Sequence, residues 1–235
     1  MEYESQMGPF GKWAKKYLDA GYSPLPIIPD HKRPAINRWQ EYCEKQASKD
    51  ELKIWLEKYE DYNIGLALGI EVKKNIRLIA IDVDSEDLVE KVKQAIGAEV
   101  PAKIGRKGIT YFMLATDKIT NTKIKRMEGE KVAIAPSVEI LCRGSQTVIP
   151  PSIHPDTGNP DKWVGTELFD NKDLPIFTES ILDEITAHCH GKGSHFNDLN
   201  EMVWKGIGGG GNTHDTCVSG VAHMVARGWS DIDVQ

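Results

Sequence analysis

Long apolar segments are missing from this chain of 235 residues. No stretch approaches the roughly 20 consecutive apolar residues that a membrane-spanning helix needs. The first residues, MEYESQMGPFGKW, lack the basic region followed by an apolar core that marks a signal peptide. The four cysteines have no paired spacing, which argues against a disulfide framework. These absences predict a soluble protein with reduced thiols, located in the cytoplasm.

An overall excess of positive charge is also missing. The formal net charge is −6, which argues against a general nucleic-acid binder. Positive charge nevertheless gathers between residues 103 and 126, where Asp117 is the single acid among Lys103, Arg106, Lys107, Lys118, Lys123, Lys125 and Arg126. Because salt screens charges beyond about 8–10 Å, a local basic surface matters more to a phosphate than the total charge does. This segment is either a surface that faces nucleic acid or a solvated, lysine-rich hairpin.

The N-terminal part of the sequence predicts helices separated by an extended segment. Apolar residues recur at helical spacing over 10–20, and Gly21 ends the run. Four prolines between residues 23 and 34 exclude a helix and favour a stiff, extended crossing. Ser48 and Glu51 have the spacing of a capping box, which predicts the start of a second helix. A third helix is expected over 86–96, after the cap residue Ser85.

Strand-like segments dominate the middle of the chain. They cover residues 63–70, 76–84, 108–115, 137–143, 146–152 and 161–165, and turn-rich links join them. Strands with few helices among them predict an α+β fold with a largely antiparallel sheet. From residue 175 onward only helical periodicity remains, so we expect an α+β domain over 1–174 and a small all-helical C-terminal domain over 175–235. Ser230 looks like the cap of a helix that is then cut off, so we expect the chain to be part of a longer protein.

Two aspartates follow the apolar run 78–81. Alternation along a strand places Asp82 and Asp84 on one face and Val83 on the other. Without a cation, the two carboxylates would cost stability or raise the pKa of one of them. Hard cations such as Mg²⁺ and Mn²⁺ take carboxylate oxygens as ligands, so the pair predicts a metal site at the end of a central strand. The same pattern also occurs by chance at strand ends.

A third acid and a proline-stiffened segment extend this prediction. Glu139 lies in the strand-like segment 137–143, and two-metal phosphoryl transfer uses several carboxylates around ions roughly 3.5–4 Å apart. In VIPPSIHPDTG, Pro150 and Pro151 stiffen the backbone, so we expect Ser152 and His154 to share a face and contact phosphate or sugar. The alternatives are a solvent-facing glutamate and a proline turn with an exposed histidine.

Five stretches, in this order over residues 10–165, carry a family resemblance: AGYSPLPIIPDHKRPAINRW, NIGLALG, LIAIDVD, VEILCRGSQTVIPPSIHPDTG and DKWVG. Together they resemble the primase-polymerase (Prim-Pol) domains of the archaeo-eukaryotic primase superfamily, found in phage and plasmid replication proteins. The resemblance implies an RRM-like antiparallel catalytic sheet with an N-terminal helical and extended module. It also implies template-directed joining of dNTPs or NTPs on single-stranded DNA in the host-cell cytoplasm, with a helicase domain often following.

The resemblance also implies roles for particular residues. Asp82, Asp84 and Glu139 match the acidic motifs and would bind two catalytic Mg²⁺ or Mn²⁺ ions. Thr110 stands where many members carry a nucleotide-binding histidine, so fixed cations nearby would contact the phosphates instead. The residues expected at the nucleotide are Arg106, Lys107, Thr110, Arg143, Ser152 and His154. Those expected along the template are Lys103, Tyr111, Lys118, Lys123, Lys125 and Arg126, with Tyr111 or Phe112 stacking on a base.

Two rival functions stay open on the sequence alone. A replication-initiator module that has lost synthesis through the change at Thr110 would bind single-stranded DNA with a steep salt dependence and extend no primer. A divalent-metal phosphohydrolase that uses the same carboxylates would release phosphate or pyrophosphate from nucleotides without any template.

Overall fold

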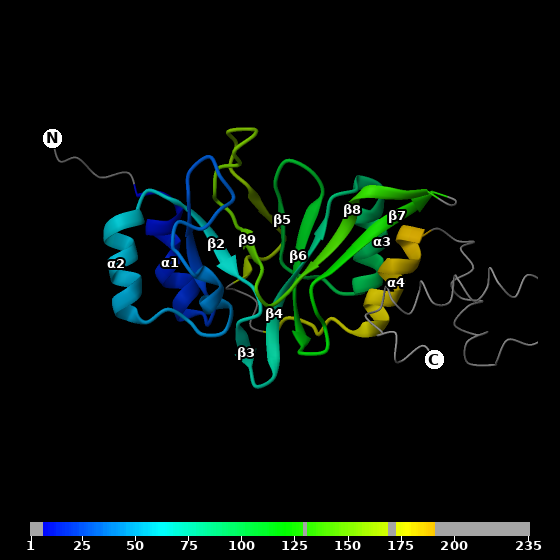
Figure 1. Ribbon diagram of the computed structural model, residues 1–235, viewed down its shortest axis with the longest axis horizontal. Helices are drawn as coiled ribbons and strands as arrows, with labels where there is room; N and C mark the ends of the chain where they lie inside the picture. The colour runs from blue at the N-terminus through cyan, green and yellow to red at the C-terminus, as the bar shows by residue number, and fades with distance from the viewer. Residues whose placement is uncertain (1–6, 129–130, 169–172, 191–235) are drawn as a thin grey trace, which may run out of the picture. The chain divides into compact units, whose positions relative to one another are not determined.

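The computed structural model describes residues 7–128, 131–168 and 173–190 (Figure 1). The chain divides into two compact units, residues 1–190 and 191–235. The second unit, which holds most of the helical domain expected over 175–235, lies outside the described residues. None of the described helices is long and apolar enough to cross a membrane.

An N-terminal module is built around a three-stranded sheet in the order β1 (Pro24–Ile27), β2 (Asn63–Ala67) and β9 (Gln146–Val148). The helix α1 (Pro9–Asp19) packs against β1 and β2, and α2 (Lys49–Tyr59) packs against α1. Ser48 and Glu51 form the predicted capping box of α2, with the Glu51 N–H donating to Ser48 Oγ at 3.2 Å. The proline-rich segment is extended as predicted: it supplies the edge strand β1 and is followed by the 3₁₀ helix η1 (Trp39–Cys43).

The larger sheet of the described chain has seven strands. Its main path runs β10 (Lys162–Val164), β5 (Ala102–Ile104), β6 (Ile109–Thr116), β4 (Ile76–Val83), β8 (Lys131–Leu141) and β7 (Thr122–Glu128). The seventh strand, β3 (Glu71–Lys73), pairs with the start of β4, although the sequence predicted a turn there. All pairings are antiparallel, which confirms the predicted α+β class with an antiparallel sheet.

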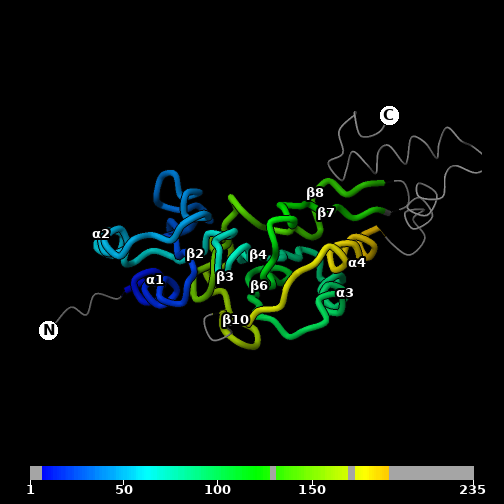
Figure 2. Tube along the Cα trace, turned by 90° about the horizontal axis from the view of Figure 1, so that it is seen from below, coloured from blue at the N-terminus to red at the C-terminus, as the bar shows by residue number. Residues whose placement is uncertain are grey.

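The central strand β4 is covered on both faces. On one face, its residues Ile79, Ile81 and Val83 pack in a core with α3 (Glu86–Ile96) and α4 (Glu179–His190), which lie side by side (Figure 2). On the other face, Leu78 and Ala80 pack in a core with the N-terminal module. Each large apolar side chain buried in this way stabilises the fold by roughly 1.5–3 kcal/mol. The apolar run before Asp82 is therefore explained by a strand buried on both sides.

The helix α4 packs with the large sheet. Ile185 and Cys189 of α4 are buried in the same core as β4 and α3, at 0% and 1% exposure. Phe177, which precedes α4, joins them at 1%. The division of the chain therefore falls after His190 and not between residues 174 and 175, because the apolar face of α4 is needed to close this core.

Candidate active site

A row of polar side chains crosses the large sheet at the end of β4. Asp82 stands directly opposite Thr110 of β6 on one side and opposite Glu139 of β8 on the other. The row continues to Lys103 of β5, opposite Thr110, and to Lys123 of β7, opposite Glu139. Directly opposed residues of antiparallel strands point to the same face, so the five side chains form one line across five strands. The predicted gathering of Asp82 and Glu139 is thus built into the strand register.

This row lies on the face that the N-terminal module covers only in part. The module packs over Leu78 and Ala80 of β4 and over Phe112 of β6. Two residues further along the strands, Asp82 and Thr110 line a pocket of about 250 Å³ instead. Asp84, which follows β4 directly, lines the same pocket. The pocket is therefore the space left where the module stops short of the end of the sheet.

The pocket combines carboxylates with an equal number of lysine and arginine side chains. The sheet and the loop 105–107 contribute Lys103, Arg106 and Lys107, and the N-terminal module contributes Lys32. The module also supplies β9, and the segment after it closes the pocket with His154, Pro155, Asp156 and Asp161. A site with carboxylates at its floor and fixed cations around them matches a nucleoside triphosphate accompanied by divalent metal ions.

Gly108 brings the cationic loop against the end of β4. Its φ of +58° lies in the left-handed region. A Cβ at this position would meet the carbonyl oxygen of Val83 at 1.7 Å, so no other residue allows this approach. Lys107 is thereby close enough to Asp84 for its positive charge to oppose the rise that burial causes in the pKa of that carboxyl.

The acids repel one another in the absence of a cation. Partial desolvation, followed by the negative charges of Asp82 and Glu139, raises the pKa of Asp84, and Lys32 and Lys107 oppose that shift. This is the effect that the sequence predicted for the unmetallated pair. Their oxygens are suitable ligands for Mg²⁺ or Mn²⁺, so the donor chemistry fits such ions. In the described part of the chain, however, no three His, Cys, Asp or Glu side chains stand together as a ready metal site.

Glu139 is the acid that stands apart. Its carboxylate lies 3.5 Å from Lys123 Nζ, and it is absent from the residues that line the pocket. The side chain of Glu139 is 22% exposed, so it retains access to the face that it shares with Asp82. A change of side-chain conformation would be needed for all three acids to share one cation cluster.

A protein-family model described as bifunctional DNA primase/polymerase, N-terminal, matches residues 14–176. The match covers more than half of the chain and spans both the N-terminal module and the large sheet. The chain belongs to this Prim-Pol family. No curated protein matches the chain. The resemblance seen in the sequence is therefore confirmed.

In this Prim-Pol domain, Thr110 holds the carboxylate of Asp82. Its hydroxyl donates a hydrogen bond of 2.7 Å to Asp82 Oδ1, and its side chain is buried at 3% exposure. Thr110, which was expected at the nucleotide, here contacts the acid itself. The register of β4 and β6 sets Thr110 directly opposite Asp82, so the hydroxyl can fix the orientation of the carboxylate.

Ser152 and His154 do not act as the predicted pair. Ser152 is fully buried, and its hydroxyl accepts from the Ile64 N–H at 2.8 Å and donates to the Ile64 carbonyl at 2.9 Å. It therefore joins two backbone segments and leaves nothing to offer a ligand. His154 does line the pocket, and its Nδ1 accepts from the Asp156 N–H at 3.2 Å. A neutral imidazole in that state carries its proton on Nε2, which is the donor that an anion needs.

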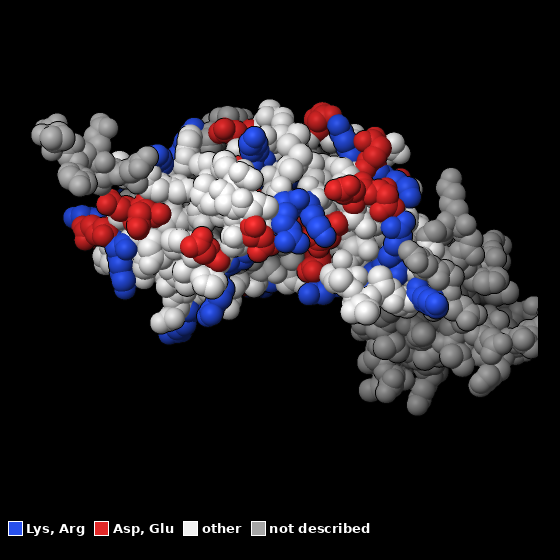
Figure 3. Space-filling model, turned by 90° about the horizontal axis from the view of Figure 1, so that it is seen from above, with Lys and Arg blue, Asp and Glu red and all other residues white. Residues whose placement is uncertain are grey.

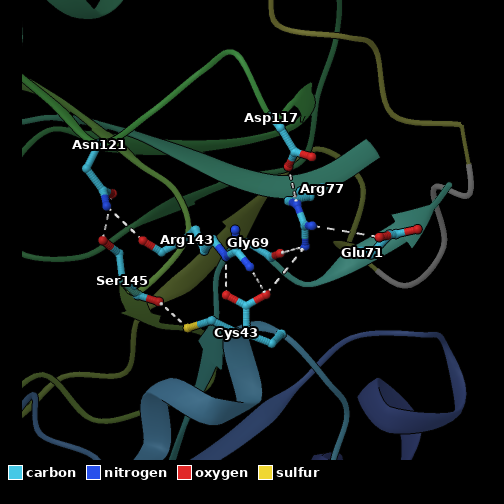
Figure 4. Close-up of polar contacts among 9 residues, drawn as sticks. Cys43, Gly69, Glu71, Arg77, Asp117, Asn121, Arg143 and Ser145 are labelled. Carbon is cyan, nitrogen blue, oxygen red and sulfur yellow. Dashed lines mark hydrogen bonds and ion pairs between the residues drawn. The ribbon is translucent and has the colours of Figure 1, made fainter. Parts of the chain in front are cut away.

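Arg143, expected at the nucleotide, lies in a different polar network (Figure 4). Its guanidinium pairs with Glu44, just after η1, and it borders a second pocket together with Arg77 of β4. Arg77 in turn contacts Asp117 and lies 3.8 Å from Glu71. This network ties the N-terminal module to the start of β4, the end of the strand opposite to Asp82.

The aromatic residues expected to stack on bases are in the core. Tyr111 is 4% exposed and donates to the Val89 carbonyl at 3.4 Å, and burial raises the pKa of its hydroxyl to about 12. Phe112 is fully buried on the opposite face, with its ring centroid 5.5 Å from that of Trp163. The prediction that one of the two faces nucleic acid is wrong, because helices cover one face of β6 and the N-terminal module covers the other.

The basic residues of 103–126 occupy three different places. Lys103 lines the pocket, where desolvation lowers its pKa against the attraction of Asp82 and Asp161. Lys118 follows Thr116, the last residue of β6. At about 3.3 Å per residue, Thr116 lies roughly 20 Å along the strand from Thr110, so Lys118 is far from the pocket. Of the residues on β7, Lys123 and Lys125 are exposed, whereas Arg126 pairs with Asp87 at 2.6 Å. Figure 3 shows acidic and basic side chains interspersed on the face that it draws.

The polar pocket residues that the sequence analysis missed include Lys32, Gln146, Asp156 and Asp161. Lys32 lies in the loop that joins β1 to η1, and Gln146 holds that loop by donating from Nε2 to the Lys32 carbonyl at 2.8 Å. Asp161 precedes β10. Each comes from a segment far from Asp82 in the sequence, so only the fold brings them to the acids.

Proposed function

We propose that this chain is a template-directed DNA primase/polymerase that joins nucleotides on single-stranded DNA by two-metal phosphoryl transfer. The observation that carries the proposal is the pocket itself, where Asp82 and Asp84 face Lys32, Lys103, Arg106 and Lys107. Membership of the family of bifunctional primase/polymerases supports the same reaction class.

The reaction would join the 3′-oxygen of a growing strand to the α-phosphorus of a nucleoside triphosphate and release pyrophosphate. Asp82 and Asp84, joined by Glu139, would hold two Mg²⁺ or Mn²⁺ ions. When bound, such ions lower the pKa of the attacking hydroxyl and neutralise charge on the phosphates. Thr110 keeps Asp82 oriented through its 2.7 Å hydrogen bond.

The cations have the complementary task. Arg106 and Lys107 lie on the loop between β5 and β6, beside Asp84, where the triphosphate would accompany the metal ions. Arg106 is held by Asp156, with 2.8 Å between Nη1 and Oδ2, so its guanidinium is already ordered. Fixed donors of this kind stabilise the charge that develops on the leaving pyrophosphate without reorganising. Lys123 and Lys125, exposed on β7 beside Glu139, would contact the phosphates of the DNA strand.

The test is primer extension and de novo synthesis on single-stranded DNA, with dNTPs or NTPs and Mg²⁺ or Mn²⁺. We expect template-dependent product from the wild type and none from Asp82→Asn/Asp84→Asn. The control Asp19→Asn changes an exposed acid that pairs with Lys15 and should retain activity. Template binding without product would favour the binding module, and triphosphate hydrolysis without template would favour the phosphohydrolase.

A further inference from the structure

Asp161 is a buried acid with one carboxylate oxygen that has no hydrogen-bond partner among the described residues. The residue is 5% exposed, and its Oδ1 has no hydrogen-bond partner within the described part of the chain. Lys103, His154 and Lys32 attract the carboxylate electrostatically, but desolvation dominates and raises the pKa of Asp161. A buried acceptor without a donor destabilises a fold by roughly 1–3 kcal/mol, more when the group is charged. A ligand that brings a donor would remove that penalty.

The surrounding backbone holds Asp161 in this position. Its N–H donates to the Ser152 carbonyl at 2.9 Å, and Ser152 is itself anchored to β2 through Ile64. Across the β5–β10 pairing stands Gly105, where a Cβ would meet Asp161 Oδ1 at 2.9 Å. The carboxylate thus uses space that exists only because residue 105 has no side chain.

The same pocket contains a second unsatisfied acceptor. Gln146 Oε1 is buried and without a hydrogen-bond partner in the described residues, while its Nε2 is committed to the Lys32 carbonyl. Since a carbonyl oxygen can only accept, the amide orientation of Gln146 is fixed by that contact. Asp161 and Gln146 both line the pocket that holds Asp82 and Asp84. The pocket therefore suits a ligand that carries hydrogen-bond donors as well as phosphates.

The chemistry of the substrate identifies the donor. A nucleoside triphosphate offers donors on its base and on its sugar, and its phosphates offer acceptors. Template-directed synthesis must accept all four bases, and a fixed carboxylate acceptor would discriminate among them. The sugar hydroxyls are the donors that every nucleotide shares. We propose that Asp161 accepts a hydrogen bond from a sugar hydroxyl of the incoming nucleotide and so determines which sugar the pocket selects.

This inference rests on the proposed function, since it assigns a subsite of the same nucleotide pocket. It makes Asp161 a specificity-determining residue that acts apart from the metal-binding acids. A hydrogen bond to a carboxylate contributes enough for a roughly 10-fold or larger difference in affinity when the hydroxyl is removed. A 2′-hydroxyl contact would favour NTPs over dNTPs, and a 3′-hydroxyl contact would favour both over dideoxynucleotides.

The experiment is calorimetric titration of the full chain with ATP, dATP and 2′,3′-dideoxy-ATP in the presence of Mg²⁺ and without template. Wild type, Asp161→Ala and Asp161→Asn are compared, with Asp173→Asn as the matched control, because Asp173 is exposed and pairs with Lys73. In the wild type and the control, we expect one of the two steps that remove a hydroxyl, ATP to dATP or dATP to dideoxy-ATP, to lower the affinity about 10-fold or more. In Asp161→Ala the nucleotides that differ by that hydroxyl should bind within about twofold of each other.

The outcomes separate the two proposals. Weaker binding of dATP than of ATP identifies the 2′-hydroxyl, and weaker binding of dideoxy-ATP than of dATP identifies the 3′-hydroxyl. Either difference supports the inference if it disappears in Asp161→Ala. Equal binding of all three by the wild type, or the same discrimination in Asp161→Ala, overturns it while primer extension still supports the proposed function. Absence of both triphosphate binding and primer extension would overturn both. Asp161→Asn keeps the size and one acceptor oxygen, so a folded variant is retained even where alanine disturbs the pocket.

Discussion

Replacing Thr110 with valine removes one hydroxyl and keeps the shape of the side chain. Thr110 is 3% exposed on β6, and its hydroxyl makes the 2.7 Å hydrogen bond to Asp82. A hydrogen bond to a charged group contributes about 1.5–3 kcal/mol, and loss of a group that orients a metal ligand costs roughly 10- to 100-fold in metal affinity or activity. We therefore expect Thr110→Val to reduce metal-dependent primer extension at least about 10-fold.

The effect on folding should be smaller than the effect on activity. Asp82 retains partial contact with solvent, so water can replace the lost donor. The free energy of unfolding should fall by no more than about 1 kcal/mol, because the apolar contacts of residue 110 survive. Thr110→Ser restores the hydroxyl and should recover most of the activity.

The assay is primer extension at a series of Mn²⁺ concentrations, combined with direct Mn²⁺ binding in the absence of nucleotide. Thr110→Val should shift the Mn²⁺ midpoint upward in both measurements, and Thr110→Ser should move it back. If Thr110→Val matches the wild type in both, the hydroxyl does not orient Asp82 for metal binding. If serine fails as badly as valine, the methyl group and its packing matter rather than the hydrogen bond.

Three further perturbations follow from contacts in the structure. Ser152→Ala should lower the free energy of unfolding by roughly 1–3 kcal/mol in urea denaturation, because it removes the hydroxyl acceptor of the buried Ile64 N–H, although the Ile64 carbonyl still accepts from the Ile149 N–H; the nucleotide affinity of the folded variant should stay unchanged. The fold raises the pKa of Asp84, so the contribution of Asp84 to stability is present below its unfolded pKa and is lost as pH rises through its folded pKa. In the presence of a chelator, Asp84→Asn should therefore be more stable than the wild type at neutral pH. A pH series of thermal melts should show the loss of stability in the wild type and not in Asp84→Asn. Lys125→Ala should weaken template binding and reduce the salt slope by about 1, and Lys118→Ala, at the far end of β6, should leave both within error in a fluorescence-anisotropy titration.

Local sequence patterns predicted most of the elements. The capping box at Ser48 and Glu51, the Gly97 that ends α3 with a left-handed φ, and the two-sided apolar run of β4 each act over a few residues. Their physical causes are hydrogen bonds and packing within one segment, which a sequence displays directly. The family resemblance predicted that Asp82 and Glu139 serve one site, but the antiparallel register that sets them opposite each other has no local signal in the sequence.

The parts that could not be predicted depend on what covers each face. Adjacent aromatic residues on a strand look the same in the sequence whether a face of the strand is open or covered. In the structure both faces are covered at Tyr111 and Phe112, so both side chains are buried. The sequence suggests that the Ser152 hydroxyl is available to a ligand. In the fold, both of its hydrogen bonds go to the backbone of Ile64, 88 residues away in the sequence. Lys32 and Asp161 carry no motif, and their place in the pocket comes only from the meeting of the two sheets.

The alternation along β4 also gives the acids a part in choosing the fold. A slip of β4 by one residue against β6 and β8 would exchange the two faces of the strand. Asp82 and Asp84 would then point into the core among Leu88 and Val92 of α3, where each uncompensated charge costs several kcal/mol. The correctly paired sheet keeps both carboxylates at the pocket. The residues assigned to chemistry thus also reject a misaligned sheet during folding, a task that the neutral residues of the same strand could not perform.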